Sequence, residues 1–355
     1  MNNSLTILLL LKGRPSFTKR WMDYMAAIKF NHKIIIADGD ADGVAKKIIN
    51  HEKYSQLNIE FFEMLQTIKY LDYYKMVLEG INRAQSQFIM LCDNDDFILL
   101  SGLNKIVSFL EKNPDHISMG GYISGFKING GAYLDYGKNF QLSFFYKKIH
   151  RLAEPTSNWY QFVHQIMFDF QSSFYNVHRR DVIKKIYSEI VQMNFSDLTV
   201  TERYYQFRLP TLGKVAYDPS ALHYLRQKGT SSSTNINVPL DLIKSDLPND
   251  IRVMADKVSL FVDEDQKKFK EHILKVYADY LGYYFSHTLL RYRFKNLFKI
   301  KNLYNHYLNK TFLYRILSFL EHQKFLSVVK KQTKSLDYKA FQKEIVMISD
   351  ILKKR

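Results

Sequence analysis

Three carboxylate side chains with the potential for chemistry lie close together in the sequence: Asp93, Asp95 and Asp96. They directly follow the apolar run Phe88–Cys92, which is typical of a buried strand. Neighbouring carboxylates repel one another, so a fold tolerates them best when a positive charge lies between them. Mg²⁺ and Mn²⁺ prefer oxygen ligands of this kind, together with phosphate oxygens. The cluster therefore indicates either a divalent-metal site or a solvated acidic turn at a strand end.

The elements around this cluster are short apolar runs that alternate with helical patterns. Further apolar runs span Leu5–Leu11, Lys33–Ala37 and, more weakly, Asn58–Phe62, and a helical pattern covers Asp72–Ala84. Alternation of this kind indicates βα units and a mostly parallel sheet flanked by helices, which is an α/β fold. In such sheets, ligands bind outside the carboxyl ends of the strands, where the acidic cluster lies.

The composition is that of a folded protein. Of 355 residues, 46% are hydrophobic and 24% are charged. The single cysteine, Cys92, excludes an internal disulfide framework and a cysteine-based zinc site. The short run Leu5–Leu11 favours a buried strand over a signal peptide, and no stretch reaches the roughly 18 apolar residues of a spanning helix. We expect a cytoplasmic protein, either free or peripheral on the inner face of the cytoplasmic membrane.

Several further motifs occur in an ordered series along residues 4–236, about two-thirds of the chain. In order, they are Lys12-Gly13-Arg14-Pro15 after the first apolar run, Ala37-Asp38-Gly39 after the second, Asp93-Asn94-Asp95, Thr201-Glu202-Arg203-Tyr204 eleven positions before Gly213-Lys214, and His223-Tyr224-Leu225-Arg226-Gln227-Lys228-Gly229 before a Ser-rich stretch. This series resembles the family-2-like glycosyltransferases, which have a GT-A fold, a DxD motif and a nucleotide-sugar donor. The resemblance rests on the order and spacing of the motifs.

The resemblance implies a role for each matching position. Asp95 would be a ligand of a divalent metal, Mg²⁺ or Mn²⁺, and Asp93 would contact the metal or the donor ribose. Asp96 would lie just behind them. Asp38 matches the acidic residue that holds the base of the donor, and Arg14 lies in the loop that contacts the nucleotide.

The same resemblance places Arg226 and Lys228 near the donor diphosphate, beside the Ser-rich stretch. Lys228 stands about where the family often has a histidine that binds the metal, so His223 is the candidate for a third metal ligand. The alternative interpretation of His223 is an ordinary buried histidine.

Glu202 matches the position of the catalytic base, a carboxylate that accepts a proton from the acceptor hydroxyl. The family usually has an acidic pair there, whereas this chain has Thr201-Glu202. Asp197 is the rival carboxylate, and a surface glutamate paired with Arg203 or Arg208 is the other interpretation of Glu202. Aromatic residues are expected to form core, with one or two facing the acceptor; they are Trp159, Tyr160, Phe168, Phe170, Phe174 and Tyr175.

The division into domains follows these motifs. We expect a catalytic domain over residues 1–236, with a donor half of about 1–126 and an acceptor half of about 127–236. Residues 237–265 would connect it to a helical, basic C-terminal region over residues 266–355.

The charge of the chain is concentrated in that C-terminal region. Residues 266–355 carry 20 Lys and Arg against 6 Asp and Glu, whereas the first 265 residues carry 31 against 29. Basic and aromatic residues alternate around Arg291–Lys301, a pattern that favours either an anionic membrane surface or plain helices with solvated lysines. Nucleic acid is a weaker alternative. The helices could equally join two copies of the chain.

These observations predict an enzyme that moves a sugar from a nucleotide-sugar donor to a hydroxyl group of a glycan or of a lipid-linked glycan acceptor. The resemblance implies inversion at the transferred carbon and a role in bacterial surface polysaccharide or lipopolysaccharide synthesis. Two alternatives remain at this stage: a sugar nucleotidyltransferase, and a non-catalytic basic adaptor that binds membranes. The adaptor would have no need of the acidic cluster.

Overall fold

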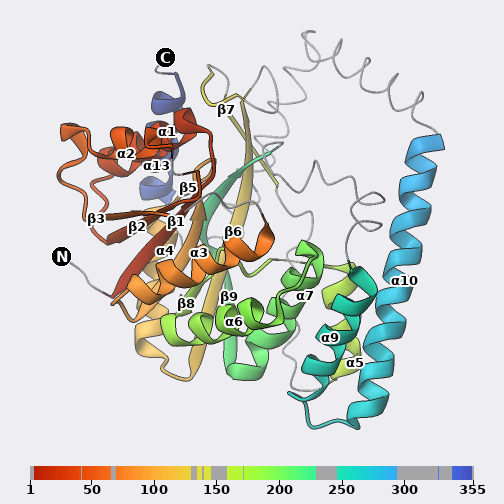
Figure 1. Cartoon of the computed structure of the whole chain (residues 1–355). Helices are drawn as coiled ribbons and strands as arrows, with labels where there is room; N and C mark the ends of the chain where they lie inside the picture. Colours follow the sequence, from red (N-terminus) through yellow and green to blue (C-terminus); the bar gives the residue numbers. More distant parts are fainter. Residues whose placement is uncertain are drawn as a thin grey trace.

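The structure is a computed structural model, and it describes residues 4–40, 42–64, 69–128, 134–137, 140–144, 158–170, 172–228, 246–293, 327 and 338–353. These residues contain a nine-stranded mixed sheet, in the order β3-β2-β1-β4-β8-β6-β9-β5, with β7 paired to β6 (Figure 1).

The first half of the sheet is parallel, as predicted. It consists of β1 (Leu5–Leu11), β2 (Lys33–Asp38), β3 (Ile59–Glu63) and β4 (Phe88–Asp93). Side chains alternate between the faces of a strand, and most residues of these strands are apolar because both faces of the sheet are covered. The four carboxyl ends meet at one edge, which brings Asp38 and Asp93 to the same side of the sheet.

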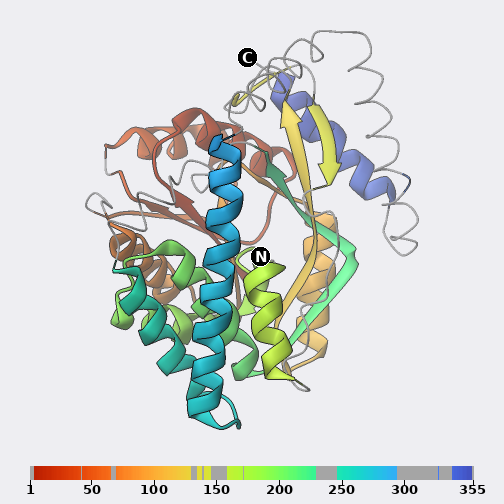
Figure 2. The same ribbon diagram turned by 90° about the vertical axis from the view of Figure 1, so that its right-hand side faces the viewer.

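Helices cover both faces (Figures 1 and 2). One core packs α1 (Pro15–Ala27), α2 (Val44–Ile49), α4 (Leu100–Lys112) and α13 (Tyr338–Lys353) against the sheet. The other core packs α3 (Tyr70–Arg83), α5 (Trp159–Phe168), α6 (Arg180–Met193), α7 (Leu198–Arg208), α9 (Leu247–Ser259) and α10 (Gln266–Arg293). Two short 3-10 helices, η1 (Glu52–Tyr54) and η2 (Leu209–Leu212), complete the described elements.

The second half of the sheet is mixed rather than mostly parallel. The strand β6 (His116–Ile128) is antiparallel to β8 (Val177–Arg179) and to β7 (Phe140–Phe144). It is parallel to β9 (Lys214–Gln227), which in turn pairs antiparallel with β5 (Phe97–Ile98). A Cβ atom on Gly121 would lie 1.9 Å from the carbonyl oxygen of Ala221, so glycine is required where β6 and β9 approach.

The C-terminal helices pack onto the sheet domain. Buried side chains of α10 join the core that contains α3 and α6, and buried side chains of α13 join the core beneath α1. Part of the predicted connecting region is itself a helix, α9, since residues 247–259 present a buried apolar face. In the described part of the chain, no helix is long and apolar enough to cross a membrane.

Candidate functional site

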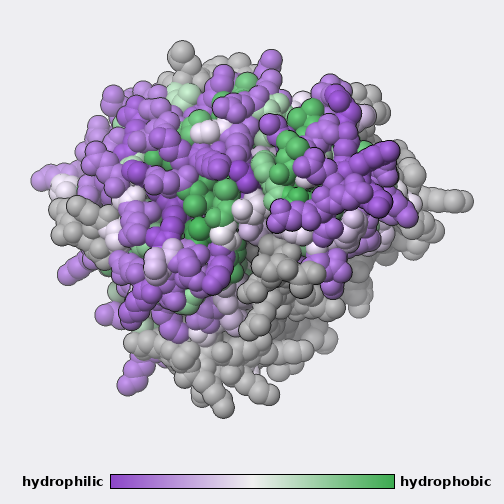
Figure 3. All heavy atoms as spheres, turned by 90° about the horizontal axis from the view of Figure 1, so that it is seen from below, coloured by the Kyte–Doolittle hydropathy of each residue, from purple (hydrophilic) through white to green (hydrophobic). Residues whose placement is uncertain are grey.

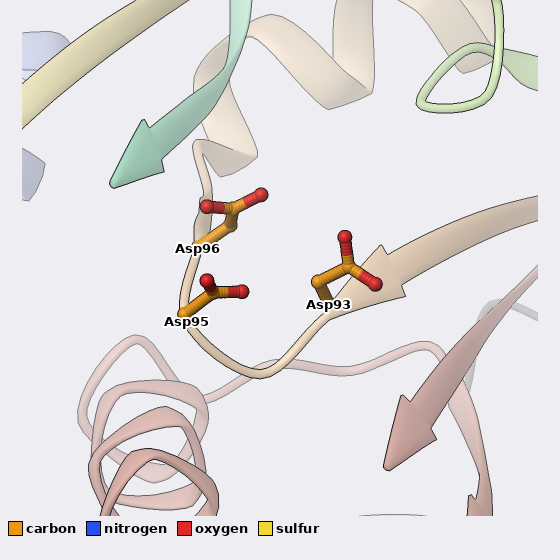
Figure 4. Close-up of side chains that lie close together, drawn as sticks. All are labelled: Asp93, Asp95 and Asp96. Atoms are coloured by element: carbon orange, nitrogen blue, oxygen red, sulfur yellow. The ribbon is translucent and has the colours of Figure 1, made fainter. Parts of the chain in front are cut away.

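The acidic cluster lies where β4 ends. The chain turns sharply after Asp93, so that Asp95 and Asp96 return toward it, and carboxylate oxygens of the three residues lie within 4.8 Å of one another (Figure 4). Asp95 and Asp96 are only 5% and 2% exposed. Burial, and next the charge of Asp95, raise the pKa of both Asp93 and Asp96. This set of hard, crowded oxygen ligands fits a divalent cation, whose charge would relieve the repulsion.

Two arginines border the cluster. Arg14 lies in the loop between β1 and α1 and places Nη1 at 2.9 Å from Oδ2 of Asp95. Arg226, near the end of β9, places Nε at 3.5 Å from Oδ2 of Asp96. The other oxygen of Asp96 accepts a 2.9 Å hydrogen bond from the backbone N–H of Gln227. The predicted Arg14, Arg226, Asp95 and Asp96 are therefore brought together from segments far apart in sequence.

A stack of two tyrosines fixes the third carboxylate. Tyr175 donates a 2.7 Å hydrogen bond to Oδ2 of Asp93, and its ring is stacked on Tyr224 with ring centres 4.4 Å apart. The guanidinium of Arg226 lies 4.7 Å from the centre of the Tyr175 ring. Tyr224 accepts a 3.2 Å hydrogen bond from the backbone N–H of Asp93. Tyr175 thus contacts the acidic cluster directly, whereas the sequence indicated only core or an acceptor groove.

A buried arginine holds the backbone of the cluster in place. Arg20 on α1 is fully buried, and its Nη2 donates a 2.6 Å hydrogen bond to the backbone carbonyl of Asp95. Its Nη1 donates to Oε1 of Gln227 and to the carbonyl of Asp135, both at 2.8 Å. The rings of Phe17 and Phe97 lie 4.6 and 4.9 Å from the guanidinium carbon. Burial lowers the pKa of Arg20 to about 10, so the side chain keeps its charge at neutral pH. The sequence alone did not indicate this residue, because an arginine within an apolar helical pattern gives no signal of its distant partners.

Asp38 occupies the carboxyl end of β2, as predicted. Its side chain is 2% exposed, and Oδ1 accepts a 3.1 Å hydrogen bond from the backbone N–H of Asp40. Its buried Oδ2 has no hydrogen-bond partner in the described part of the chain. Burial, and next the charge of Asp40, raise the pKa of Asp38. A buried acceptor atom without a partner is costly, so this oxygen is suited to an N–H donor from a bound molecule.

The two candidate base residues differ in their surroundings. Asp197 begins α7, and its Oδ1 accepts hydrogen bonds from the backbone N–H groups of Thr199 and Val200, at 2.7 and 3.1 Å. This is the geometry of a helix cap. The side chain of Glu202, one turn later, reaches solvent, yet surrounding protein crowds its carboxylate and raises its pKa. Glu202 is therefore a carboxylate open to a reacting molecule, whereas Asp197 is committed to α7.

Glu202 and Asp93 of the acidic cluster both act electrostatically on one tyrosine, Tyr73. Burial raises the pKa of Tyr73, a residue of α3, and the negative charges of Asp93 and Glu202 raise it further. The charge of Arg226 acts on Glu202 in the opposite sense and lowers its pKa. The base candidate and the acidic cluster therefore share one electrostatic environment.

His223, the candidate third metal ligand, lies in β9, and Lys228, a candidate donor contact, directly follows that strand. His223 is fully buried in β9, with Nε2 at 2.9 Å from the carbonyl oxygen of Tyr175, and burial lowers its pKa to about 4. It does not belong to the carboxylate group, in which Asp96 is the third member. Lys228 directly follows β9, and its side chain lies over Gly125. The Ser-rich stretch that follows lies outside the described residues.

Most of the predicted aromatic cluster is packing. Trp159 and Tyr160 on α5 contact Phe269 of α10, with ring centres 6.3 and 5.6 Å apart. Phe170 lies under the guanidinium of Arg203 at 3.9 Å. The exceptions are Phe168, which is 43% exposed, and Tyr175, which donates to Asp93.

The chain resembles known proteins in sequence and in fold. Residues 27–174 match the family model for glycosyl transferase family 2. A structure of S. aureus TarS residues 1–349 is 14% identical with a TM-score of 0.51, and the match covers 98% of this chain and 90% of that chain. The same fragment in complex with UDP-GlcNAc is 13% identical with a TM-score of 0.50, over the same shares of both chains. No curated protein matches the sequence.

A longer S. aureus TarS chain is also similar, at 14% identity and a TM-score of 0.50. That match covers 80% of this chain and 44% of that chain, so this chain spans less than half of that relative. At these identities the structural likeness establishes the fold, and the family model carries the class of enzyme. Together they confirm the predicted GT-A fold and the predicted resemblance to the family 2 glycosyltransferases.

Proposed function

We propose that this family-2-like glycosyltransferase moves a sugar from a nucleotide-sugar donor to a hydroxyl group of a glycan or glycolipid acceptor, with Mg²⁺ or Mn²⁺ at Asp93, Asp95 and Asp96. One observation carries the proposal: three carboxylates lie within 4.8 Å of one another at the carboxyl end of β4, with two of them almost fully buried. Such a group is unfavourable by itself and becomes favourable around a cation that also binds a diphosphate.

The donor would lie across the carboxyl ends of β1, β2 and β4. The free buried oxygen of Asp38 can accept a hydrogen bond from a ring N–H of the base, such as that of uracil. Arg14 and Arg226 border the carboxylates and can bind diphosphate oxygens, and Lys228 adds a charge at the end of β9. The complex of TarS with UDP-GlcNAc makes a UDP-sugar the first donor to test.

In the transfer step, the acceptor oxygen forms a bond to the anomeric carbon of the sugar while the bond from that carbon to the diphosphate breaks. A bound divalent cation would supply positive charge for the leaving diphosphate. Arg14 and Arg226 can share that task, because both lie beside the cluster. Glu202 takes the proton of the acceptor hydroxyl, and inversion at the anomeric carbon follows if the acceptor attacks opposite the leaving group.

Glu202 is preferred to Asp197 as the base for a structural reason. The capping bonds from the backbone N–H groups of Thr199 and Val200 hold the carboxylate of Asp197 at the start of α7, whereas the side chain of Glu202 reaches solvent. The raised pKa of Glu202 strengthens it as a proton acceptor. Asp197 instead holds the first turn of α7, on which Glu202 is carried.

The proposal also covers the acceptor and the location of the enzyme. A role in bacterial surface polysaccharide synthesis, on the inner face of the cytoplasmic membrane, is supported by the excess of basic residues after position 265. Charge reversal at Arg291, Arg293, Lys295 and Lys299 should weaken binding to anionic vesicles and preserve activity on a short soluble acceptor. Vesicle binding that is unaffected by these changes and by salt would contradict a membrane role.

The central test is a screen of UDP-sugars with Mn²⁺ or Mg²⁺, with release of the nucleoside diphosphate as the readout. We expect release in the presence of metal, none in excess EDTA, and none from Asp95→Asn. Asp115→Asn is the matched control, because this exposed carboxylate lies outside the cluster and pairs with Lys214. Full activity in EDTA would refute the metal site, and formation of pyrophosphate with a sugar 1-phosphate would indicate a nucleotidyltransferase instead.

A further inference from the structure

The C-terminal helix α13 packs against α1 and contacts the start of α4, the helix that follows the acidic cluster, although about 240 residues separate α13 from the cluster in sequence. Figure 1 shows α13 beside α1, the helix that directly follows Arg14 and carries Arg20. Its residues Phe341, Ile348 and Leu352 are almost fully buried in the core beneath α1. A helix that only carried surface charge would have no need of this buried face.

One side chain of α13 caps the helix that follows the cluster. Glu344 is 8% exposed, and its Oε1 accepts hydrogen bonds from the backbone N–H groups of Leu100 and Ser101, at 2.5 and 3.3 Å. Its Oε2 accepts a hydrogen bond from Oγ of Ser101 at 2.5 Å. The N-cap residue of α4, Leu99, has no side chain able to cap it. A carboxylate at this place satisfies free N–H groups and complements the helix dipole.

This cap fixes the end of the segment that carries the carboxylates. Only β5 and Leu99 separate Asp96 from Leu100, and β5 is pinned to β9 by pairing of Phe97 and Ile98. The backbone N–H of Leu99 donates a 2.8 Å hydrogen bond to the carbonyl of His223. The segment from Leu100, which Glu344 contacts, back to Asp96 is therefore short, and hydrogen bonds to β9 hold its backbone.

A second path joins the end of α13 to the cluster. The carbonyl of Leu352 accepts a 2.8 Å hydrogen bond from the backbone N–H of Gly137. Two residues earlier, the carbonyl of Asp135 accepts from Arg20, which also donates to the carbonyl of Asp95. Two parts of α13 are thus connected to the carboxylate loop, its middle through Glu344 and its last turn through Leu352.

We propose that α13 is a positioning element of the active site, in which Glu344 and the turn at Leu352 hold the carboxylate loop in the geometry that binds metal and donor. The inference rests on the proposed function for the metal at Asp93, Asp95 and Asp96. Glu344 touches none of the reacting groups, so it is a positioning residue and not a catalytic one. The C-terminal region then has two parts with different tasks, since α13 serves the site whatever the other basic residues bind.

The test compares Glu344→Ala, Glu344→Gln and the control Ile348→Ala, which removes buried packing from the same helix. The readouts are the Mn²⁺ concentration for half-maximal UDP-sugar hydrolysis, the KM for the donor, kcat and the melting temperature. We expect Glu344→Ala to raise the Mn²⁺ requirement and the donor KM by about 2- to 30-fold, the range of coupling through packed networks. Glu344→Gln should recover much of this loss, because its amide oxygen can still accept from Leu100. Ile348→Ala should lower the melting temperature without this change in metal requirement.

Equal metal requirements in Glu344→Ala and the wild type would overturn the proposal, as would equal effects of Glu344→Ala and Ile348→Ala. If Glu344→Ala does not fold, Ser101→Ala removes a single hydrogen bond of the cap and should raise the Mn²⁺ requirement in the same direction. A wild-type enzyme that transfers sugar without metal would instead contradict the proposed function, so the two failures are distinguishable.

Discussion

Substitution of Tyr175 by phenylalanine tests whether the orientation of Asp93 matters to the metal site. The change removes one atom, the hydroxyl oxygen that donates a 2.7 Å hydrogen bond to Oδ2 of Asp93. Phenylalanine keeps the ring between Tyr224 and Arg226, where the ring centres are 4.4 Å apart and the guanidinium lies at 4.7 Å. The packing of the site is therefore retained, and the loss is confined to one charged acceptor.

The expected magnitude follows from the strength of that bond. A hydrogen bond to a charged group contributes about 1.5–3 kcal/mol. If this energy serves to hold the carboxylate for a cation, its loss weakens metal binding by about 10- to 100-fold, since about 1.4 kcal/mol is a factor of ten. The bond from Tyr175 also lowers the pKa of Asp93, against burial and the charge of Asp95 that raise it. Without this bond, protonation competes with the metal at higher pH, so the acid limb of the pH–activity profile should move to higher pH.

The assay is isothermal titration of Mn²⁺ into the protein with UDP present, together with a pH profile of donor hydrolysis. Tyr224→Phe is the matched control, because Tyr224 belongs to the same stack but contacts the backbone N–H of Asp93 and the sulfur of Cys92. We expect only a small change in metal affinity there. Equal Mn²⁺ affinities for Tyr175→Phe and the wild type would refute the argument, and so would equal losses in both variants.

Three further predictions follow from the site. Glu202→Gln should lower kcat by about 100-fold with little change in donor binding. Asp197→Asn should mainly lower the melting temperature, because it removes part of a helix cap that contributes about 0.5–2 kcal/mol. The reverse pattern in kinetics and thermal melts would make Asp197 the base. Asp38→Asn should raise the KM for a UDP-sugar more than it lowers kcat, and an unchanged KM would exclude a contact with the base. Without metal, stability should fall as pH rises through the raised pKa values of Asp93 and Asp96, because the folded state binds the protons more tightly than the unfolded state. Added Mn²⁺ should reverse that fall at neutral pH, and pH-independent melting in EDTA would contradict it.

The parts of the fold that the sequence predicted are those determined by local pattern. The apolar runs Leu5–Leu11, Lys33–Ala37 and Phe88–Cys92 became strands within one residue of their expected bounds. Their carboxyl ends then placed Asp38 and Asp93 at one edge, because parallel strands share their direction. The mixed half of the sheet was not predicted, since the pairing of β6 with β8 and β9 depends on contacts between distant segments.

Some of the residues around the carboxylates also could not be predicted from local sequence pattern. Arg20 and Tyr175 contact Asp95 and Asp93 across 75 and 82 positions of sequence, and neither belongs to a motif that marks it. The resemblance left His223 open as a metal ligand or as an ordinary buried histidine, and in the structure it is buried in a strand with its Nε2 at 2.9 Å from the carbonyl oxygen of Tyr175. Asp96, which was expected just behind the metal, lies among the carboxylates that could bind it. A motif thus identified the loop, while the structure identifies what holds it.

The arrangement of these supports has a physical reason. Three carboxylates without a cation repel one another, and a loop free to relax would separate them and lose the metal geometry. Here the loop is bound through its backbone by Arg20, through its side chains by Arg14, Tyr175 and Arg226, and at its end by the capped α4. Most of these contacts are charged or charge-assisted, and those to Arg20 and Glu344 are buried, so they resist the repulsion without water to screen them. The free energy needed to hold the carboxylates together is therefore supplied when the protein folds, and not each time a donor binds. For this reason α13, near the other end of the chain, belongs to the catalytic unit.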